Sequence, residues 1–427
     1  MLPTTPRSPS QPGRYQHLLL VLIVCAAVLG LVPGYFAPSF SISYLKIFGE
    51  MFLAALRGII VPLVMTSMIC GVASLGDVRR LGRMGGTTVA YYMTTTFMAV
   101  LLGLILVNII RPGDTYQVDR EAAQVAAAEK LEQRGDYELS QAFHDIIMSF
   151  FSTNIIKSMA EMDILPLIMF SLILGAILTT TPRGRLVLDV VEGLNEAFLK
   201  FVKLIILFTP LGVLGLVSAK LGEATLKDDG AFFLQLAALG QYAFTVVLGL
   251  LVHGLVVLPI ILRWFTRRSP LLFITAMGKA LMTAFATASS SATLPVTIDS
   301  LERQAEVSAR SAGFVAPLGA TINMDGTALY EAVAAMFIAQ SFGIELTITQ
   351  QVIVFFTATL AAIGAAGIPE AGLVTLILVL KAVELPLEGI GLILAIDWLL
   401  DRCRTTVNVW GDAVGAAVMD KLVPEDR

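Results

Sequence analysis

The chain contains a succession of apolar segments, each long enough to cross the roughly 30 Å hydrocarbon core of a bilayer. The fourth segment is interrupted by Lys157, Glu161 and Asp163, so we expect it to form broken pieces. Only 15% of the 427 residues are charged and 56% are hydrophobic, whereas globular proteins carry about 25% charged residues. The chain is therefore predicted to be an all-α polytopic membrane protein. The first six segments cover residues 15–36, 42–75, 81–110, 143–180, 194–221 and 232–264.

Charged residues between the segments set the expected orientation. Residues 1–14 are rich in Pro, Ser and Thr and are expected to be a disordered N-terminus before a retained first span, not a cleaved signal peptide. Basic clusters follow the second, fourth and sixth segments: Arg79, Arg80 and Arg83; Arg183 and Arg185; Arg263, Arg267 and Arg268. The positive-inside rule places these clusters and both chain termini in the cytoplasm, with 111–142 as an extracytoplasmic loop. Four residues oppose this orientation: Arg120, Lys130, Arg134 and Lys227.

Several functional classes do not fit the composition. The net charge is only −4 and no dense Lys/Arg run is present, so a nucleic-acid partner is not expected. The three cysteines lie in apolar stretches and form no disulfide framework. The three histidines are scattered without the spacing of a zinc site, which argues against a metalloenzyme.

Two later apolar segments are predicted to turn back within the membrane. Residues 269–303 have basic residues at both ends and a small, polar centre that ends at Pro295, which suits a re-entrant hairpin from the cytoplasmic side. Residues 350–383 have a small-residue centre that ends at Pro369 and mostly acidic flanks, which suits a hairpin from outside. In both cases 28 residues separate the tip proline from a polar residue of the next span, Asn323 or Asp397. Paired units of opposite orientation are typical of transporters with a central site.

The spans that follow these hairpins carry unusual polar residues. Asn323-Met324-Asp325-Gly326-Thr327 lies in an otherwise apolar run from 311 to 342, and we expect it to be an unwound midpoint of that span. An ionised Asp at such a position costs roughly 3 kcal/mol on insertion scales, so a partner is expected. The last span, 390–422, places a row of polar residues on one helical face by steps of three and four. These residues are Asp397, Asp401, Arg404, Thr405, Asn408 and Asp412.

The balance of charge in these spans favours cations and a carboxylate ligand. The acidic residues outnumber the two arginines nearby, Arg402 and Arg404, and unpaired carboxylates in a membrane call for cations or protons. A guanidinium is in turn the best bidentate clamp for a carboxylate. Mutual neutralisation of Arg404 and Asp401 remains an alternative. The cluster Tyr91–Thr96 in the third span either bonds back to its own helix or completes an oxygen cage beside Asp325.

Three motifs, 288–295, 323–327 and 401–408, resemble the glutamate transporter family, the dicarboxylate/amino acid:cation symporters. The resemblance covers nearly the whole chain and is closest to the animal excitatory amino acid transporters. It implies a homotrimer in which each chain has eight spans and two re-entrant hairpins. Spans 1, 2, 4 and 5 (15–75 and 143–221) would form a trimerisation scaffold. Residues 81–110 and 232–422 would form a transport domain that crosses the bilayer like an elevator.

The resemblance also implies roles for single residues. The substrate would contact Ser289, Ser290, Ser291, Thr327, Asp401, Arg404, Thr405 and Asn408. One sodium site would use Gly319, Asn323, Asn408 and Asp412; another would use Tyr92, Thr95, Thr96, Asn323 and Asp325. A third would lie between Thr321 and backbone oxygens of Ala362, Ile363 and Ala365. Gly367 and Pro369 would shape the outer gate.

Further positions place the chain within the family. Glu331 and Arg402 resemble the animal members, in which the acid carries a proton and is needed for potassium counter-transport. Departures from the family pattern are Ala362, Glu370 and Cys403, of which Glu370 adds a charge at the gate.

The leading hypothesis is a sodium-driven symporter of aspartate, glutamate or both, in a bacterial inner membrane or a plasma membrane, in contact with lipid. Proton and potassium coupling are further expectations from the resemblance. The rivals of the same fold are a neutral amino acid carrier, which usually lacks the arginine at 404, and a C4-dicarboxylate carrier, which gives Asp401 no amino group to hold. More distant alternatives are an intramembrane hydrolase and a channel. No base lies near Ser289–Ser291 in the sequence and no G-x-S-x-G elbow is present, so an enzyme is not expected.

Overall fold

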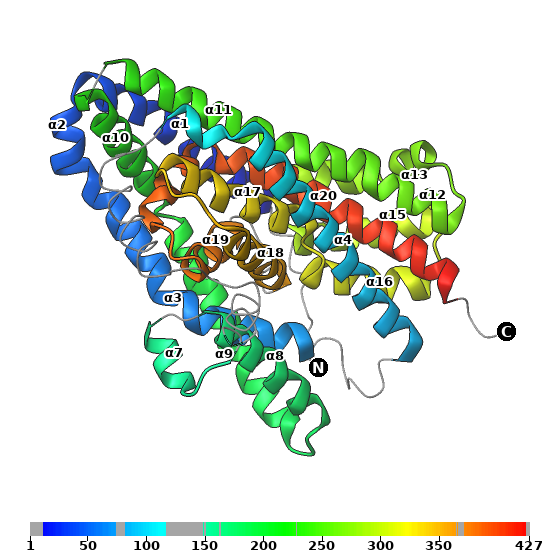
Figure 1. Ribbon diagram of the computed structural model, residues 1–427. Helices are drawn as coiled ribbons and strands as arrows, with labels where there is room; N and C mark the ends of the chain where they lie inside the picture. Colours follow the sequence, from blue (N-terminus) through cyan, green and yellow to red (C-terminus); the bar gives the residue numbers. More distant parts are fainter. Residues whose placement is uncertain are drawn as a thin grey trace, which may run out of the picture.

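The computed structural model describes residues 12–73, 82–116, 148, 151–161, 164–227, 229–363, 365 and 371–423, and within these ranges every regular element is a helix (Figure 1). The first half contains α1 (Pro12–Phe36), α2 (Pro38–Phe40), η1 (Ser41–Leu45), α3 (Lys46–Ala73), α4 (Gly82–Ile110), η3 (Pro112–Thr115), α7 (Ile155–Glu161), α8 (Ile164–Thr180), α9 (Gly184–Ile206) and α10 (Thr209–Lys227). The second half contains α11 (Asp229–Val252), η4 (His253–Val257), α12 (Leu258–Thr266), α13 (Pro270–Ala276), α14 (Gly278–Thr287), α15 (Ser290–Arg303), α16 (Ala309–Ile322), α17 (Asp325–Ser341), α18 (Ile348–Ile363), α19 (Ala371–Ala382), η5 (Leu387–Gly389) and α20 (Ile390–Leu422). The prediction of an all-helical chain is confirmed for this part of the sequence.

A first helix group consists of α1, α2, α3, α8, α9 and α10. In it α1 lies along α10, and α3 contacts α8, α9 and α10. Small residues allow the close approach of α1 and α10, because a Cβ at Gly30 would lie only 3.3 Å from the carbonyl oxygen of Leu214. Such small-residue contacts are typical of helix pairs in membranes.

A second helix group consists of α4, α11, α12 and α14 to α20. Its centre is α17, which is buried along all 17 of its residues and packs against α4, α18 and α20. In Figure 1 the long α20 crosses the middle of the molecule beside α17 and α4. The two groups meet mainly where α10 contacts α11 and α20.

The two predicted hairpins are both helix–turn–helix units. In the first, α14 and α15 pack on each other around Ala288, which adopts a left-handed conformation with φ 49°. The Oγ of Ser289 then accepts a hydrogen bond from the Ala292 N–H at 3.1 Å and caps the start of α15. In the second, α18 packs on α19. The predicted gate residues Gly367 and Pro369, together with Glu370, lie outside the described residues.

The expectation of one continuous span over 194–221 is wrong. The structure has two helices there, α9 and α10, which are separated at Leu207 and Phe208. Pro210 lies in the first turn of α10, where its missing N–H costs nothing, whereas inside a continuous helix it would remove a hydrogen bond. The fourth segment is broken as expected, into α7 and α8.

Length and composition alone identify few of the helices as complete membrane spans. Within the described residues, Met84–Thr115 and Phe233–Thr266 pass as single spans. Two further pairs pass only when counted across a bend, Val28–Phe36 with Pro38–Phe52 at 114° and Pro270–Ala276 with Gly278–Thr287 at 58°. The remaining apolar helices are short or, like α20, carry several charged side chains.

Candidate functional site

The centre of the site is a break between α16 and α17. Helix α16 ends at Ile322, Asn323 and Met324 are non-helical, and α17 begins at Asp325, as the sequence predicts. The last carbonyl groups of one helix and the first N–H groups of the next therefore lie side by side without their usual helical partners. Carbonyl ends attract cations and N–H ends attract anions.

One polar cluster surrounds Asp325, which is fully buried. Its Oδ1 accepts hydrogen bonds from the hydroxyls of Thr96 at 2.6 Å and Thr95 at 3.3 Å. Its Oδ2 lies 3.0 Å from Nε2 of the equally buried His253. Tyr92 reaches this cluster through its main-chain carbonyl, which accepts from Thr95 at 3.1 Å. The structure thus brings together four of the five residues predicted for this sodium site, and hard oxygens of this kind suit such a cation.

Asn323 joins this cluster to a second one around Asp412. Its Nδ2 donates to Asp412 Oδ1 at 2.8 Å and to the main-chain carbonyl of Asn408 at 3.4 Å. The side-chain oxygen of Asn323 is buried and has no hydrogen-bond partner among the described residues. A buried acceptor without a donor is rare, and it is suited to a cation. Gly319 faces Asp412, and a Cβ there would lie 2.6 Å from the Tyr92 hydroxyl, so this position has no room for a side chain.

A cavity with about 250 Å³ of empty space lies where the two hairpins meet α17 and α20. Three helices begin at its wall: α15 at Ser290, α17 after Met324, and α19 at Ala371. Helix N-termini present unpaired N–H groups and a positive dipole end, so they favour anions. The cavity is lined by Ala288, Ser290, Met324, Thr327, Ala365, Ala371, Gly372, Asp401, Thr405 and Asn408.

Arg404 lies directly behind the cavity wall and is 1% exposed. A Cβ on the lining residue Gly372 would be only 3.1 Å from its Nη1. Its guanidinium donates to Asp397 at 3.1 and 3.4 Å and to Asp401 at 2.9 Å. Its Cζ lies 3.7 Å from the centre of the Tyr330 ring, a cation–π contact. The alternative in which Arg404 only neutralises Asp401 is incomplete, because two acids face this one cation.

Of the other predicted substrate residues, most line the cavity and two do not. Asn408 connects the cavity to the helix break, since its Oδ1 accepts from the Gly326 N–H at 2.8 Å and its Nδ2 donates to Thr327 Oγ1 at 3.3 Å. Ser290 lines the cavity. In this structure Ser289 caps α15 and Ser291 is exposed, so neither lines the cavity wall.

The residues predicted for coupling lie nearby. Glu331 is fully buried on α17, and one carboxylate oxygen accepts a short hydrogen bond from the Thr375 hydroxyl. Its other oxygen has no partner among the residues that the structure describes. Arg402 donates to the carbonyls of Phe285 and Ala286 at 2.7 Å each, so it caps the C-terminal end of α14 beside the first hairpin tip.

The third predicted sodium site is only partly described. Ala362 and Ala365 are buried, and the Ala365 N–H donates to the Ala362 carbonyl at 3.1 Å in the turn after α18. The hydroxyl of Thr321 bonds to the Pro317 carbonyl of its own helix at 3.4 Å. Ile363 is the last residue of α18.

His253 is the main residue that the sequence interpretation missed. It was set aside because its spacing fits no zinc site, yet an ionisable residue inside an apolar span is by itself a sign of function. Asp397 was placed on the polar face of the last span but given no role, although it is the second acid on Arg404. The start of α19 at the cavity had no local sequence signal.

Comparisons with known proteins agree with this geometry. The family model described as "Sodium:dicarboxylate symporter family" matches residues 19–422. Excitatory amino acid transporter 3 of Mus musculus is 38% identical over 95% of this chain and 86% of the relative. The Homo sapiens protein of the same name is 39% identical over 95% and 85%, and excitatory amino acid transporter 1 of Ambystoma tigrinum is 36% identical over 94% and 82%. The chain belongs to the sodium:dicarboxylate symporter family, whose members are transporters.

Proposed function

We propose that this protein is a sodium-driven symporter of acidic amino acids, aspartate or glutamate. The observation that carries the proposal is the convergence of three helix N-termini and the Arg404 guanidinium on one small cavity. Such a site suits a ligand with two carboxylates, one at the helix starts and one at the arginine. Asp401 lines the same cavity and suits the amino group of that ligand.

Sodium coupling is supported by the acids that no arginine contacts. Asp325 and Asp412 are fully or almost fully buried, and their hydrogen-bond partners are hydroxyls, an amide and a histidine. Cations bound beside them offset the cost of burying the carboxylates. Because Asn323 and Asn408 contact both the sodium clusters and the cavity, ion binding and substrate binding share the same side chains.

We further propose that the second helix group moves past the first, which stays fixed in a homotrimer embedded in lipid. In this arrangement the chain has eight spans and two re-entrant hairpins, crosses the cell membrane several times and keeps both termini in the cytoplasm. The proposal is supported by the separate packing of the two groups and by the family to which the chain belongs.

Uptake into proteoliposomes tests the transport proposal. We expect labelled aspartate and glutamate to accumulate when sodium is outside, with serine and succinate transported poorly. Preferred uptake of serine would replace the proposal with a neutral amino acid carrier, and preferred uptake of succinate with a C4-dicarboxylate carrier. Uptake that ignores the sodium gradient would contradict sodium coupling.

Proton co-transport and potassium counter-transport are proposed for Glu331, which contacts Thr375 of the second hairpin. In a Glu331→Gln variant we expect internal potassium to lose its acceleration of net uptake, because the amide has no charge to exchange. Exchange of internal for external aspartate should persist and serves as the folding control. Unchanged potassium dependence would remove Glu331 from the coupling mechanism.

A further inference from the structure

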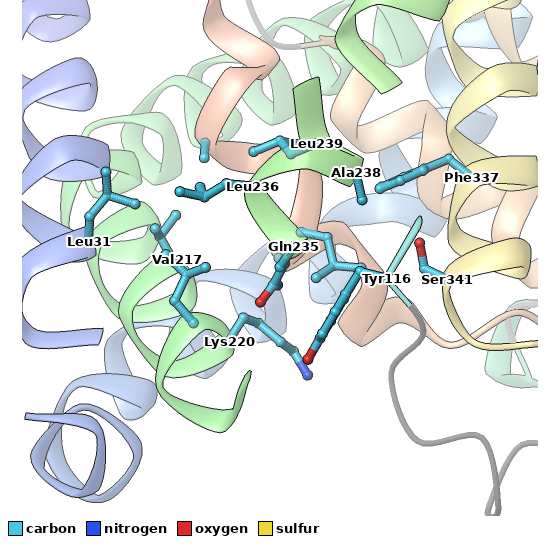
Figure 2. A pocket seen from close by; sticks show the side chains of 14 residues that line it. Leu31, Tyr116, Val217, Lys220, Gln235, Leu236, Ala238, Leu239, Phe337 and Ser341 are labelled. Atoms are coloured by element: carbon cyan, nitrogen blue, oxygen red, sulfur yellow. The ribbon is translucent and has the colours of Figure 1, made fainter. Parts of the chain in front are cut away.

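A second pocket, with about 440 Å³ of empty space, lies between the two helix groups (Figure 2). Its walls come from α1 and α10 of the first group and from α11, α17 and α20 of the second, with Tyr116 beside them. It shares no lining residue with the cavity beside Arg404. The two pockets are therefore separate sites.

The pocket combines an apolar wall with unsatisfied polar atoms. Leu31, Leu236 and Leu239 line one part of it, and Figure 2 shows Gln235 and Lys220 next to each other on another part. Gln235 is 7% exposed, yet its side-chain oxygen has no hydrogen-bond partner within the described residues. The hydroxyl of Ser341, also in the wall, is buried and likewise unpaired there. Buried polar atoms of this kind normally have a partner.

The charges around the pocket do not call for an ionic ligand. Lys220 is already paired with Glu223 at 3.1 Å, and Glu223 is also paired with Lys46 at 3.3 Å. Lys46 lies 3.9 Å from Glu50, so the two ammonium groups are balanced by two carboxylates. A neutral head group fits such a site better than an anion, which would compete with Glu223.

We propose that this pocket binds a neutral, single-chain amphiphile whose hydroxyl group pairs with Gln235. A hydroxyl both donates and accepts, so it satisfies the Gln235 amide whichever way that amide is turned. The hydrocarbon chain occupies the leucine-lined part. The space holds at most about 15 groups of the size of a water molecule, which limits the ligand to a chain of medium length.

The location gives this ligand a consequence for transport, which rests on the proposed movement of the two groups. A molecule that contacts both groups binds only while their walls face each other as in this structure. It therefore stabilises this arrangement relative to any in which the second group has moved. Bound ligand slows substrate uptake without competing for the cavity beside Arg404.

Photolabelling of the purified protein in lipid nanodiscs tests the site directly and needs no transport. A decanol analogue with a diazirine in its chain should label α10 and α11 saturably, and unlabelled decanol should compete. Decane and decanoate should compete at least fivefold more weakly. The Gln235→Leu variant should bind decanol about fivefold more weakly, the loss of one hydrogen bond. Gln241→Leu is the matched control on the same helix, because Gln241 bonds to Thr115 and lines neither pocket.

Three results would overturn the proposal. Unsaturable labelling would show that the analogue only reports contact with lipid, and equal competition by decane would remove the role of the hydroxyl. Equal binding by Gln235→Leu and the wild type would remove Gln235. An Ala395→Leu variant, which fills the pocket from α20, should lose labelling while it still takes up aspartate. If labelling behaves as expected but decanol slows uptake equally in the wild type and Gln235→Leu, the binding site holds and the proposed link to movement fails.

Discussion

Single buried side chains decide the chemistry of this protein. Arg404, Asp397 and Asp401 form one charged group that is almost completely buried. Removing one partner from such a group leaves an uncompensated charge and costs about 3–5 kcal/mol. The arginine and its two acids therefore have to be treated as a unit in any mutational study.

The contact between His253 and Asp325 gives a prediction at this scale. Because a carboxylate only accepts, Nε2 is the donor to Asp325 Oδ2, and the imidazole fixes the carboxylate so that Oδ1 faces Thr95 and Thr96. A His253→Leu variant should raise the half-saturating sodium concentration for uptake roughly tenfold, as expected for a lost hydrogen bond to a charged group.

A second variant separates this positioning role from simple damage to the core. The amide nitrogen of Gln reaches about as far as Nε2, so His253→Gln should restore most of the sodium affinity. Aspartate affinity at saturating sodium should change little in either variant. If His253→Leu and His253→Gln are equally impaired in sodium affinity, the hydrogen bond does not position the carboxylate.

At the scale of helices, local sequence signals predicted much of the architecture. The break at Asn323 follows from polar residues and Gly326 inside an apolar run, and the last helix has the predicted limits, 390–422. The break at Leu207 was missed because the apolar pattern continues across it, although Pro210 marks it. The contact of His253 with Asp325 and the three helix starts at one cavity depend on residues far apart in the chain. No local periodicity reports such contacts.

Glycine at the start of α17 is predicted to be required by packing. A Cβ at Gly326 would lie 2.7 Å from the main-chain carbonyl of Arg404, which belongs to a rigid helix and has little room to move. Gly326→Ala should therefore lower the thermal unfolding midpoint of the detergent-purified protein, with a cost of about 1–3 kcal/mol for overpacking.

Gly313 in α16 is the matched control for this substitution. A Cβ at Gly313 would meet nothing within 4 Å, so Gly313→Ala should be neutral or stabilise the helix by up to about 1 kcal/mol. Equal midpoints for the two variants would mean that the α17 start moves away from α20 more easily than the structure indicates.

For the whole molecule, the question is whether the two helix groups move relative to each other. Their contact between α10 and α20 contains a pair of positions suited to a cross-link. A Cβ at Gly391 would lie 3.5 Å from Leu216 Cβ, inside the range of roughly 3.5–4.5 Å found in disulfides. If α20 slides past α10 during transport, a disulfide between these positions should stop uptake.

The cross-link experiment uses Leu216→Cys with Gly391→Cys in a chain whose own three cysteines are replaced by alanine. Oxidation should reduce aspartate uptake at least tenfold, and a reducing agent should restore it. The control pair is Gly30→Cys with Val217→Cys, whose Cβ atoms would lie 3.4 Å apart within the first group. That disulfide should form equally well, by mass spectrometry, and leave uptake unchanged. Continued uptake with the Leu216–Gly391 positions fully cross-linked would show that α10 and α20 stay together, and transport would then have to use the hairpins alone.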